Sequence, residues 1–122
     1  LVEDLQDGLP VIEANGGQLQ QLLINLVHNG RDAILVAKKT GCIRIRTRVL
    51  GDGVAVEVED DGAGIPENIR ERVFEPFFTT KEKGAGTGLG LSVCRAIAQE
   101  HGGRLRLGNS AFGTRMILEL PY

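Results

Sequence analysis

The sequence predicts an α/β fold of two layers, a sandwich in which helices cover one face of a mixed, mostly antiparallel sheet. Three patterns support this prediction. Leucines recur at helical spacing in residues 19–26, branched residues alternate with charged ones in residues 43–59, and a second helical pattern follows a glycine-rich run. The 122 residues are enough for one core, and no repeat or linker divides them, so we expect residues 1–122 to form a single domain.

Composition and charge narrow the classes of function. The net charge of −2 argues against a nucleic-acid partner. No apolar run approaches the roughly 20 residues of a membrane span, so we expect no direct membrane contact. Cys42 and Cys94 are far apart and are expected to be buried thiols of a reducing, cytoplasmic compartment. Because the sequence starts at Leu1 without a signal-peptide pattern, we expect a piece of a longer protein.

A short edge strand is predicted at residues 9–12, and a long helix is predicted from Gly16-Gly17 to a stop at Gly41. The apolar residues of this helix share one face: Leu19, Leu22, Leu23, Leu26, Ala33, Ile34 and Ala37. A polar stripe lies beside that face rather than opposite it: Gln18, Asn25, Asn29 and Asp32. The stripe either lines a cleft or merely flanks the core. His28 and Arg31 point toward solvent.

Residues 43–59 predict a hairpin whose apolar side chains face the helices and whose charged side chains face water. If the hairpin loop closes at Gly51-Asp52, or contains four residues, the apolar and the charged side chains stay on separate faces. That register pairs Val49 with Val54, Ile45 with Val58, Arg46 with Glu57 and Arg44 with Glu59. We therefore expect the arginines of the first strand to form a solvated sheet face rather than an anion site.

The segment after the hairpin combines acids, glycines and aromatic residues. Asp60 to Pro66 predicts a turn with a carboxylate at its mouth, and a short helix is expected from Glu67 to Val73. The following loop carries Phe77 and Phe78, which either anchor a hinged lid or form a buried aromatic pair.

The glycine-rich run from Gly84 to Leu91 lets the backbone approach a ligand, and the helix behind it offers N–H groups to a phosphate. It lacks the Gly-Lys-Ser/Thr ending of a P-loop and the dinucleotide-binding spacing, and a flexible surface linker is the alternative. The apolar positions of the helix are Leu89, Val93, Ala96 and Ile97.

The end of the chain predicts a helix stop and two strands. The helix continues to Glu100 and ends at His101-Gly102-Gly103. Strands are expected at residues 104–107 and 114–120, with Met116, Leu118 and Leu120 on one face.

Five short motifs occur in order along the chain: Asn25-x-x-x-Asn29, Asp60-x-Gly62-x-Gly64, Glu75-Pro76-Phe77-Phe78, Gly86-x-Gly88-x-Gly90 and Gly113-Thr114. Together they resemble the ATP-binding catalytic domain of sensor histidine kinases, within the superfamily of gyrase, Hsp90, histidine kinase and MutL. The resemblance extends from about Gly17 to Leu120. It implies the Bergerat fold, with ATP between the long helix and a mobile lid.

The resemblance also implies roles for individual residues. Asp60 would accept a hydrogen bond from the adenine amine, and Thr114 would steady a water between them. Gly62 and Gly64 would bend the backbone under the base, which Ile65 and Ala33 would flank. Asn29 would bind Mg²⁺, and Asn25 would contact the same cluster. The backbone of the glycine-rich run would bind the triphosphate: Gly86, Thr87, Gly88, Leu89, Gly90 and Leu91.

The chain departs from the family pattern at Asp32 and Ala33, where histidine kinases often carry Lys and an aromatic residue. We count both positions among the nucleotide-binding residues and assign the basic phosphate ligand to Lys81. Asn25 and Lys81 are then the expected catalytic residues. The pair Asp60-Asp61 replaces the commoner Asp-Asn, so which carboxylate meets adenine is open.

The implied function is transfer of the γ-phosphoryl group of Mg-ATP to a histidine on a separate dimerisation domain, which passes it to a response-regulator receiver domain. His28 and His101 lack the acidic neighbour of an acceptor histidine and are expected to be structural or surface residues. A non-catalytic nucleotide-binding or docking module is the alternative. A gyrase- or Hsp90-type ATPase is disfavoured, because Asn25 replaces the Glu that activates water there.

Overall fold

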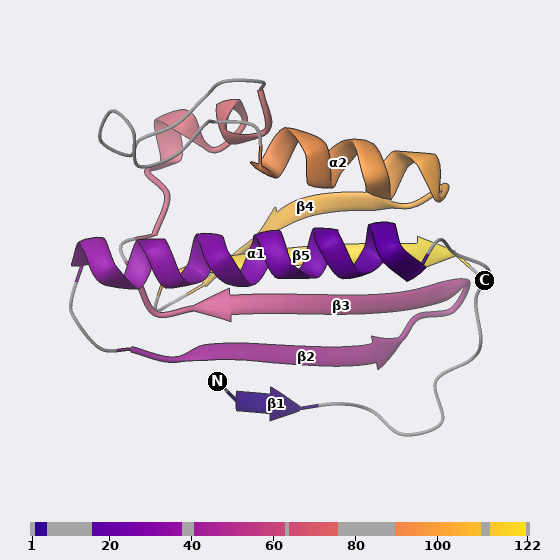
Figure 1. Cartoon of the computed structure of the whole chain (residues 1–122), viewed down its shortest axis with the longest axis horizontal. Helices are drawn as coiled ribbons and strands as arrows, with labels where there is room; N and C mark the ends of the chain where they lie inside the picture. The colour runs from indigo at the N-terminus through magenta and orange to yellow at the C-terminus, as the bar shows by residue number, and fades with distance from the viewer. Residues whose placement is uncertain are drawn as a thin grey trace.

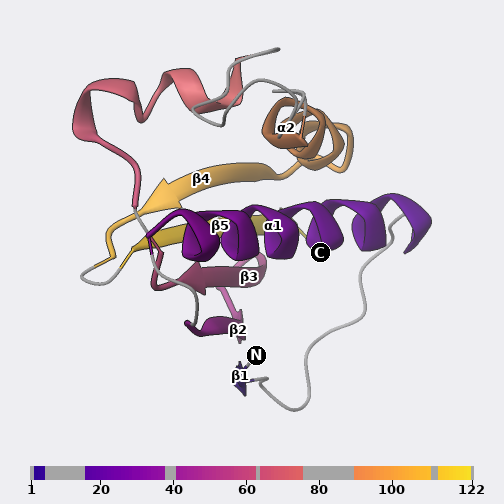
Figure 2. The same cartoon turned by 60° about the vertical axis from the view of Figure 1, so that its left-hand side comes forward.

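The computed structural model describes residues 2–4, 16–37, 41–62, 64–75, 90–110 and 113–121. Within these residues, five strands form one sheet in the order β1-β2-β3-β5-β4. Their bounds are Val2–Asp4 for β1, Ile43–Val49 for β2, Gly53–Asp60 for β3, Arg104–Gly108 for β4 and Thr114–Pro121 for β5. β1 and β2 are parallel and the other neighbours antiparallel, which confirms a mixed, mostly antiparallel sheet (Figures 1 and 2).

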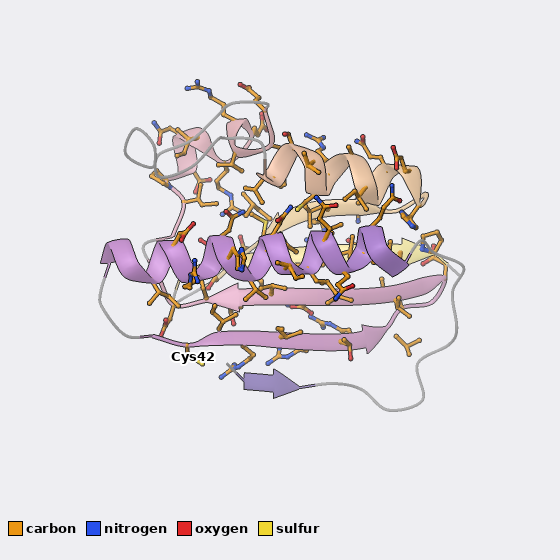
Figure 3. The ribbon with its side chains drawn as sticks, viewed as in Figure 1. Cys42 is labelled. Atoms are coloured by element: carbon orange, nitrogen blue, oxygen red, sulfur yellow. The ribbon has the colours of Figure 1, made fainter. Side chains whose placement is uncertain are left out.

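Two α-helices, α1 (Gly16–Ala37) and α2 (Gly90–Glu100), pack on the same face of this sheet (Figure 1). Side chains fill the space between the layers (Figure 3). The buried core draws on both helices and on three strands: Leu22, Leu26, Val54, Val58, Cys94, Ile97, Ala98, Leu105, Met116, Leu118 and Leu120. The predicted two-layer α/β architecture is confirmed.

The register of the β2–β3 hairpin is confirmed, since Val49 pairs with Val54 and Arg46 with Glu57. The prediction that its charged face is wet is wrong at Glu57, which is only 3% exposed. The Glu57 carboxylate accepts hydrogen bonds from Arg48 and from Arg115 of β5. Glu57 is on β3, which lies between β2, the strand of Arg48, and β5, the strand of Arg115. Both long arginine side chains therefore reach Glu57 and cover it.

The buried face of α2 differs from the predicted one. Val93 is 37% exposed and Ala96 is exposed, whereas Cys94, Ile97 and Ala98 are buried. The core-facing residues follow an i, i+3, i+4 spacing, and the small thiol and methyl groups let α2 pack closely on α1 and the sheet. The prediction is therefore confirmed for Ile97 and wrong for Val93 and Ala96. Leu89, the first residue of the predicted pattern, lies outside the described residues.

The predicted end of α2 is confirmed. Gly102 has φ +73°, and Gly103 N–H donates to the carbonyl of Ala98 at 2.9 Å, as in a Schellman motif. His101 Nδ1 lies 2.8 Å from the carbonyl oxygen of Ile97. This histidine therefore has the structural role expected for it.

Two other short elements differ from prediction. The segment 67–73 forms two 3₁₀ turns, η1 (Glu67–Ile69) and η2 (Arg72–Phe74), rather than one helix. Seven residues after a proline are too few to nucleate a stable α-helix without further packing. The edge strand expected at residues 9–12 lies outside the described residues, and the edge strands of the described sheet are β1 and β4.

Candidate functional site

Asp60 is the last residue of β3 and is buried, with 6% of its surface exposed. Its Oδ1 accepts a hydrogen bond from the backbone N–H of Gly62 at 2.9 Å, and the backbone N–H of Thr114, its partner on β5, also donates to the carboxylate. Burial raises the pKa of Asp60, and these two hydrogen bonds oppose that rise. A buried carboxylate therefore sits where β3 leaves the sheet.

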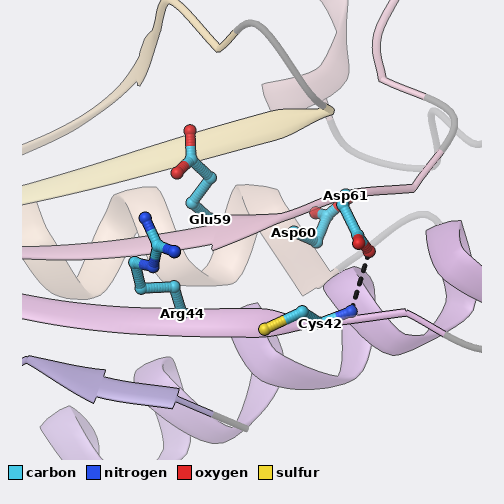
Figure 4. Close-up of a pocket in the computed structure, with 5 residues that line it drawn as sticks. All are labelled: Cys42, Arg44, Glu59, Asp60 and Asp61. Atoms are coloured by element: carbon cyan, nitrogen blue, oxygen red, sulfur yellow. Dashed lines mark hydrogen bonds between the residues drawn. The ribbon is translucent and has the colours of Figure 1, made fainter.

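The neighbouring acid, Asp61, has a different role. Its Oδ1 accepts from the backbone N–H of Cys42 at 2.8 Å, and its own N–H donates to the Cys42 carbonyl at 3.3 Å (Figure 4). These bonds tie the end of β3 to the residue before β2. The two adjacent carboxylates thus point in different directions: Asp60 lies under α1, and Asp61 lies toward the β2–β3 hairpin. This difference favours Asp60 as the acid available to a ligand.

A hollow of about 240 Å³ lies over the ends of β2 and β3, where Arg44 and Glu59 pair across the strands (Figure 4). Cys42 lines it and is half-buried, so the expectation that both thiols are buried is confirmed only for Cys94. The paired Arg44 and Glu59 belong to the charged face of the sheet, opposite the face that α1 and α2 cover.

Gly30 and Gly62 allow α1 to lie close to Asp60. A Cβ added at Gly30 would lie 3.3 Å from Asp60 Cβ and 3.5 Å from Asp60 Oδ2. A Cβ added at Gly62 would lie 2.6 Å from the carbonyl carbon of Ala33 on α1. The turn after β3 therefore rests on the α1 backbone, which a side chain at residue 62 would prevent. The sequence reading missed Gly30, although a glycine inside a long helix was the available signal.

The asparagines of α1 lie toward α2. Asn29 Nδ2 is 4.0 Å from where a Cβ on Gly90 would stand, so this carboxamide is beside the first residue of α2. The Asn25 side chain hydrogen-bonds the Cys94 thiol, one turn into α2. The N–H groups of the first turn of a helix lack intrahelical partners and carry the positive end of its dipole. Two carboxamides and a helix N-terminus thus lie together.

The remaining predicted site residues have the following places. Ile65 and Leu91 are half-buried and pack against the core, and Asp32 and Ala33 are half-buried on α1. Gly64 has φ +76°, a conformation that favours glycine. Several predicted residues lie outside the described residues: Lys81, Gly86, Thr87, Gly88 and Leu89, together with Phe77 and Phe78 of the expected lid.

Phe74 and Glu75 are the described residues that precede this undescribed segment. The guanidinium of Arg95, on α2, lies 5.3 Å from the centroid of the Phe74 ring. A cation over an aromatic face at this distance is attractive. η2 is therefore held against α2 at the point where the chain leaves the described part.

Residues 14–122 match the family described as histidine kinase-, DNA gyrase B- and HSP90-like ATPases. The two-component sensor PprA of Pseudomonas aeruginosa is 40% identical over 115 residues, which cover 91% of this chain and 12% of PprA. The chain thus spans a small part of this curated relative. No helix within the described residues is long and apolar enough to cross a membrane.

The fold is similar to those of solved histidine kinases. The catalytic domain of histidine kinase ThkA, in a nucleotide-free form, has a TM-score of 0.81 and 40% identity, with 98% of this chain and 80% of that chain covered. ThkA in complex with the response regulator protein TrrA has a TM-score of 0.78 and 36% identity, with 98% of this chain and 33% of that chain covered.

Proposed function

This chain belongs to the family of histidine kinase-, DNA gyrase B- and HSP90-like ATPases, and we propose that it binds Mg-ATP and donates the γ-phosphoryl group to a histidine on a separate dimerisation domain. Its relatives and structural neighbours are two-component sensor histidine kinases, and its fold is that of their ATP-binding catalytic domain. On this proposal, residues 1–122 are one domain of a longer, cytoplasmic or membrane-anchored kinase.

The observation that carries this proposal is the buried carboxylate of Asp60. Burial makes the charged form of this carboxylate costly, so a donor that hydrogen-bonds it gains more than it would in water. The amine of adenine is such a donor, and Gly30 lets α1 lie against this carboxylate with no side chain between them. The backbone N–H of Thr114 donates to the same carboxylate, which supports Thr114 as the residue that would hold a bridging water.

The α1 carboxamides fit a magnesium ion that is shared with phosphates. Amide oxygens are ligands suited to a hard cation, and Mg²⁺ prefers few protein ligands beside water and phosphate oxygens. Asn29 lies beside Gly90, where helix N–H groups suit a triphosphate. When bound, the ion would neutralise charge on the phosphates. We assign the remaining basic contact to Lys81.

Transfer to a histidine is favoured over hydrolysis because of Asn25. A hydrolytic member of the family needs a general base at this position, and a carboxamide cannot take a proton from water. Phosphoryl transfer to a nucleophilic imidazole requires positioning and charge neutralisation rather than a base on this chain. The ThkA–TrrA complex supports a response regulator as the next partner, and we propose that its receiver domain takes the phosphoryl group from the dimerisation-domain histidine.

The proposal is tested by calorimetric titration of a non-hydrolysable ATP analogue, with and without Mg²⁺. We expect binding that tightens with Mg²⁺, and Asp60→Asn should weaken it about 10- to 100-fold, the range for a lost hydrogen bond to a charged group. Glu59→Gln, one residue earlier on the opposite face, is the control and should bind as the wild type does. Unchanged affinity in Asp60→Asn would refute the adenine assignment. No binding at millimolar analogue would favour the docking module.

A further inference from the structure

The face of the sheet opposite α1 and α2 is rich in arginine. Because side chains alternate across a strand, the residues of β2, β3, β5 and β4 that lie between the core positions share this face, which we call the open face. On these four strands its acids are Glu57, Glu59 and Glu119, and its arginines are Arg44, Arg46, Arg48, Arg104, Arg106 and Arg115. The open face thus has a formal charge of +3 in a chain of net charge −2.

At the centre of the open face, the acid lies beneath the arginines. The Glu57 side chain is 4% exposed and is bound by Arg48 and Arg115, whose side chains are 46% and 27% exposed. A guanidinium has five N–H donors, and a carboxylate takes one or two of them. Because the negative group is covered and the positive groups are outermost, a partner that approaches this part of the face meets guanidinium groups.

Glu119 holds a second pair of arginines near the β4 edge. It accepts hydrogen bonds from Arg104 at 3.1 Å and from Arg106 at 2.6 Å, and the bond from Arg106 lowers its pKa. Its side chain is 21% exposed, whereas those of the two arginines are 68% and 46% exposed. One glutamate with two arginines leaves a net positive charge here as well. A side chain that is already held in place loses less conformational entropy when it binds a ligand.

The two arginine clusters are close enough for one short ligand. Ile117 of β5 pairs with Glu57 of the first cluster and with Arg106 of the second, so the clusters meet across a single strand. Four strands about 4.8 Å apart span about 15 Å. Guanidinium forks bind carboxylates in a bidentate geometry. The face therefore fits a few carboxylates on one short stretch of chain.

We propose that the open face is a docking surface for a short, carboxylate-rich segment of a partner protein. Charge complementarity supports this occupant. The residues outside the face include eight basic and 13 acidic side chains, a formal charge of −5, which would repel a long polyanion such as a nucleic acid or an anionic membrane. Two copies of the chain would not join through this face, because like charges would then meet.

A peptide of about six glutamates, whose extended length of about 20 Å matches the face, is the probe. It is titrated into the isotope-labelled, nucleotide-free chain at low salt, and binding is followed by the chemical shifts of the backbone amides. We expect the largest shifts in β3, β4 and β5. The affinity should fall as salt is added, because exposed ion pairs are screened.

A double variant tests whether the arginines of the face bind the peptide. Arg104→Gln with Arg106→Gln should weaken binding about three- to thirtyfold, the range for two exposed ion pairs. Arg31→Gln with Arg72→Gln is the matched control, since it removes the same charge from exposed residues of α1 and η2. Its affinity should stay within about 1.5-fold of the wild type.

The opposite change should have the opposite effect. Glu119→Gln removes the acid between two arginines, so more guanidinium donors and one more positive charge become available, and binding should tighten about two- to fivefold. Glu100→Gln, an exposed position on α2, is its control and should bind as the wild type does. These substitutions are at partly or fully exposed side chains, so the amide spectra should show a retained fold.

The proposal is overturned if the wild type does not bind the peptide at millimolar concentration, if the Arg31/Arg72 control loses as much affinity as the Arg104/Arg106 variant, or if Glu119→Gln binds more weakly. Tighter binding of a single-stranded oligonucleotide of the same charge, or of vesicles of phosphatidylserine and phosphatidylcholine, would also overturn it, because the ligand would then be a phosphate. No nucleotide is present in this titration, so its outcome is independent of the proposed function.

Discussion

At the scale of single residues, the site depends on two adjacent carboxylates with opposite tasks. Asp61 is satisfied within the fold, since Cys42 N–H donates to it at 2.8 Å. Asp60 is buried deeper, and within the described residues its donors are the backbone N–H groups of Gly62 and Thr114. Burial of the Asp60 carboxylate, whose described donors are uncharged, opposes folding, which is typical of a group retained for binding rather than for stability.

The cost of burying the Asp60 carboxylate predicts that the stability of the nucleotide-free domain depends on pH. Because burial raises the folded-state pKa of Asp60 above its unfolded value of about 3.9, the folded state binds more protons over that interval. The contribution of Asp60 to stability is therefore present at low pH and is lost as the pH rises through its folded pKa. Asp60→Asn should gain stability relative to the wild type over the same interval and keep that advantage at neutral pH.

Denaturant unfolding of both proteins at several pH values checks this prediction. In the difference between the two free energies of unfolding, the contributions of the other titrating groups cancel when the substitution leaves those groups unchanged. A difference that stays constant with pH, or that moves in favour of the wild type as the pH rises, would contradict it.

At the scale of elements, the sequence predicted contacts that depend on neighbours along the chain. The register of β2 on β3 followed from alternation and turn length, and both determine pairing within one hairpin. The burial of Glu57 did not follow, because its second partner, Arg115, belongs to a strand that is distant in sequence. The face of α2 was predicted correctly only at Ile97 for a similar reason: the core also takes Cys94 and Ala98 for their small size against α1, and Val93 remains exposed.

The charged face of the sheet gives a prediction about stability. Glu57 is almost fully covered and bound by two arginines, whereas Glu119 accepts from Arg104 at 3.1 Å and Arg106 at 2.6 Å with its side chain 21% exposed. Glu57→Gln should destabilise the domain by about 1.5–3 kcal/mol, the range for hydrogen bonds to a charged group.

Glu119→Gln is the matched control, because its ion pairs are screened by water and should contribute less, about 0–1 kcal/mol. Chemical denaturation of the two variants at one pH gives both values. Equal losses, or a larger loss for Glu119→Gln, would show that burial does not set the strength of these contacts.

At the scale of the whole molecule, the candidate site joins segments far apart in sequence. α1 supplies Asn25 and Asn29, the end of β3 supplies Asp60, and α2 begins with Gly90 beside Asn29. The ordered short motifs resemble those of a family, and that resemblance predicted which residues belong to one site. It could not predict that Gly30 leaves room for Asp60 or that Cys94 contacts Asn25, because both depend on how closely the elements pack.

The same arrangement predicts that this chain cannot phosphorylate its own histidines. His101 lies just beyond the C-terminal end of α2, and 11 helical residues separate the ends by about 16 Å. Its Nδ1 is also engaged by the carbonyl of Ile97. His28 is exposed and does not belong to the asparagine stripe. The His101 ring is therefore too far from a phosphate held at the N-terminus of α2, and the exposed His28 ring does not belong to the side chains that would contact that phosphate.

Radiolabelled ATP with Mg²⁺ should therefore leave the isolated domain unlabelled, and label should appear on the histidine-containing dimerisation domain of the parent protein when that domain is added. Asn25→Ala, which keeps the helix but removes the carboxamide, should reduce this transfer. Labelling of His28 or His101 would contradict the geometry described above. Nucleotide binding without transfer to the added domain would instead identify the chain as a docking module, since an assembled site and a competent acceptor would both be present.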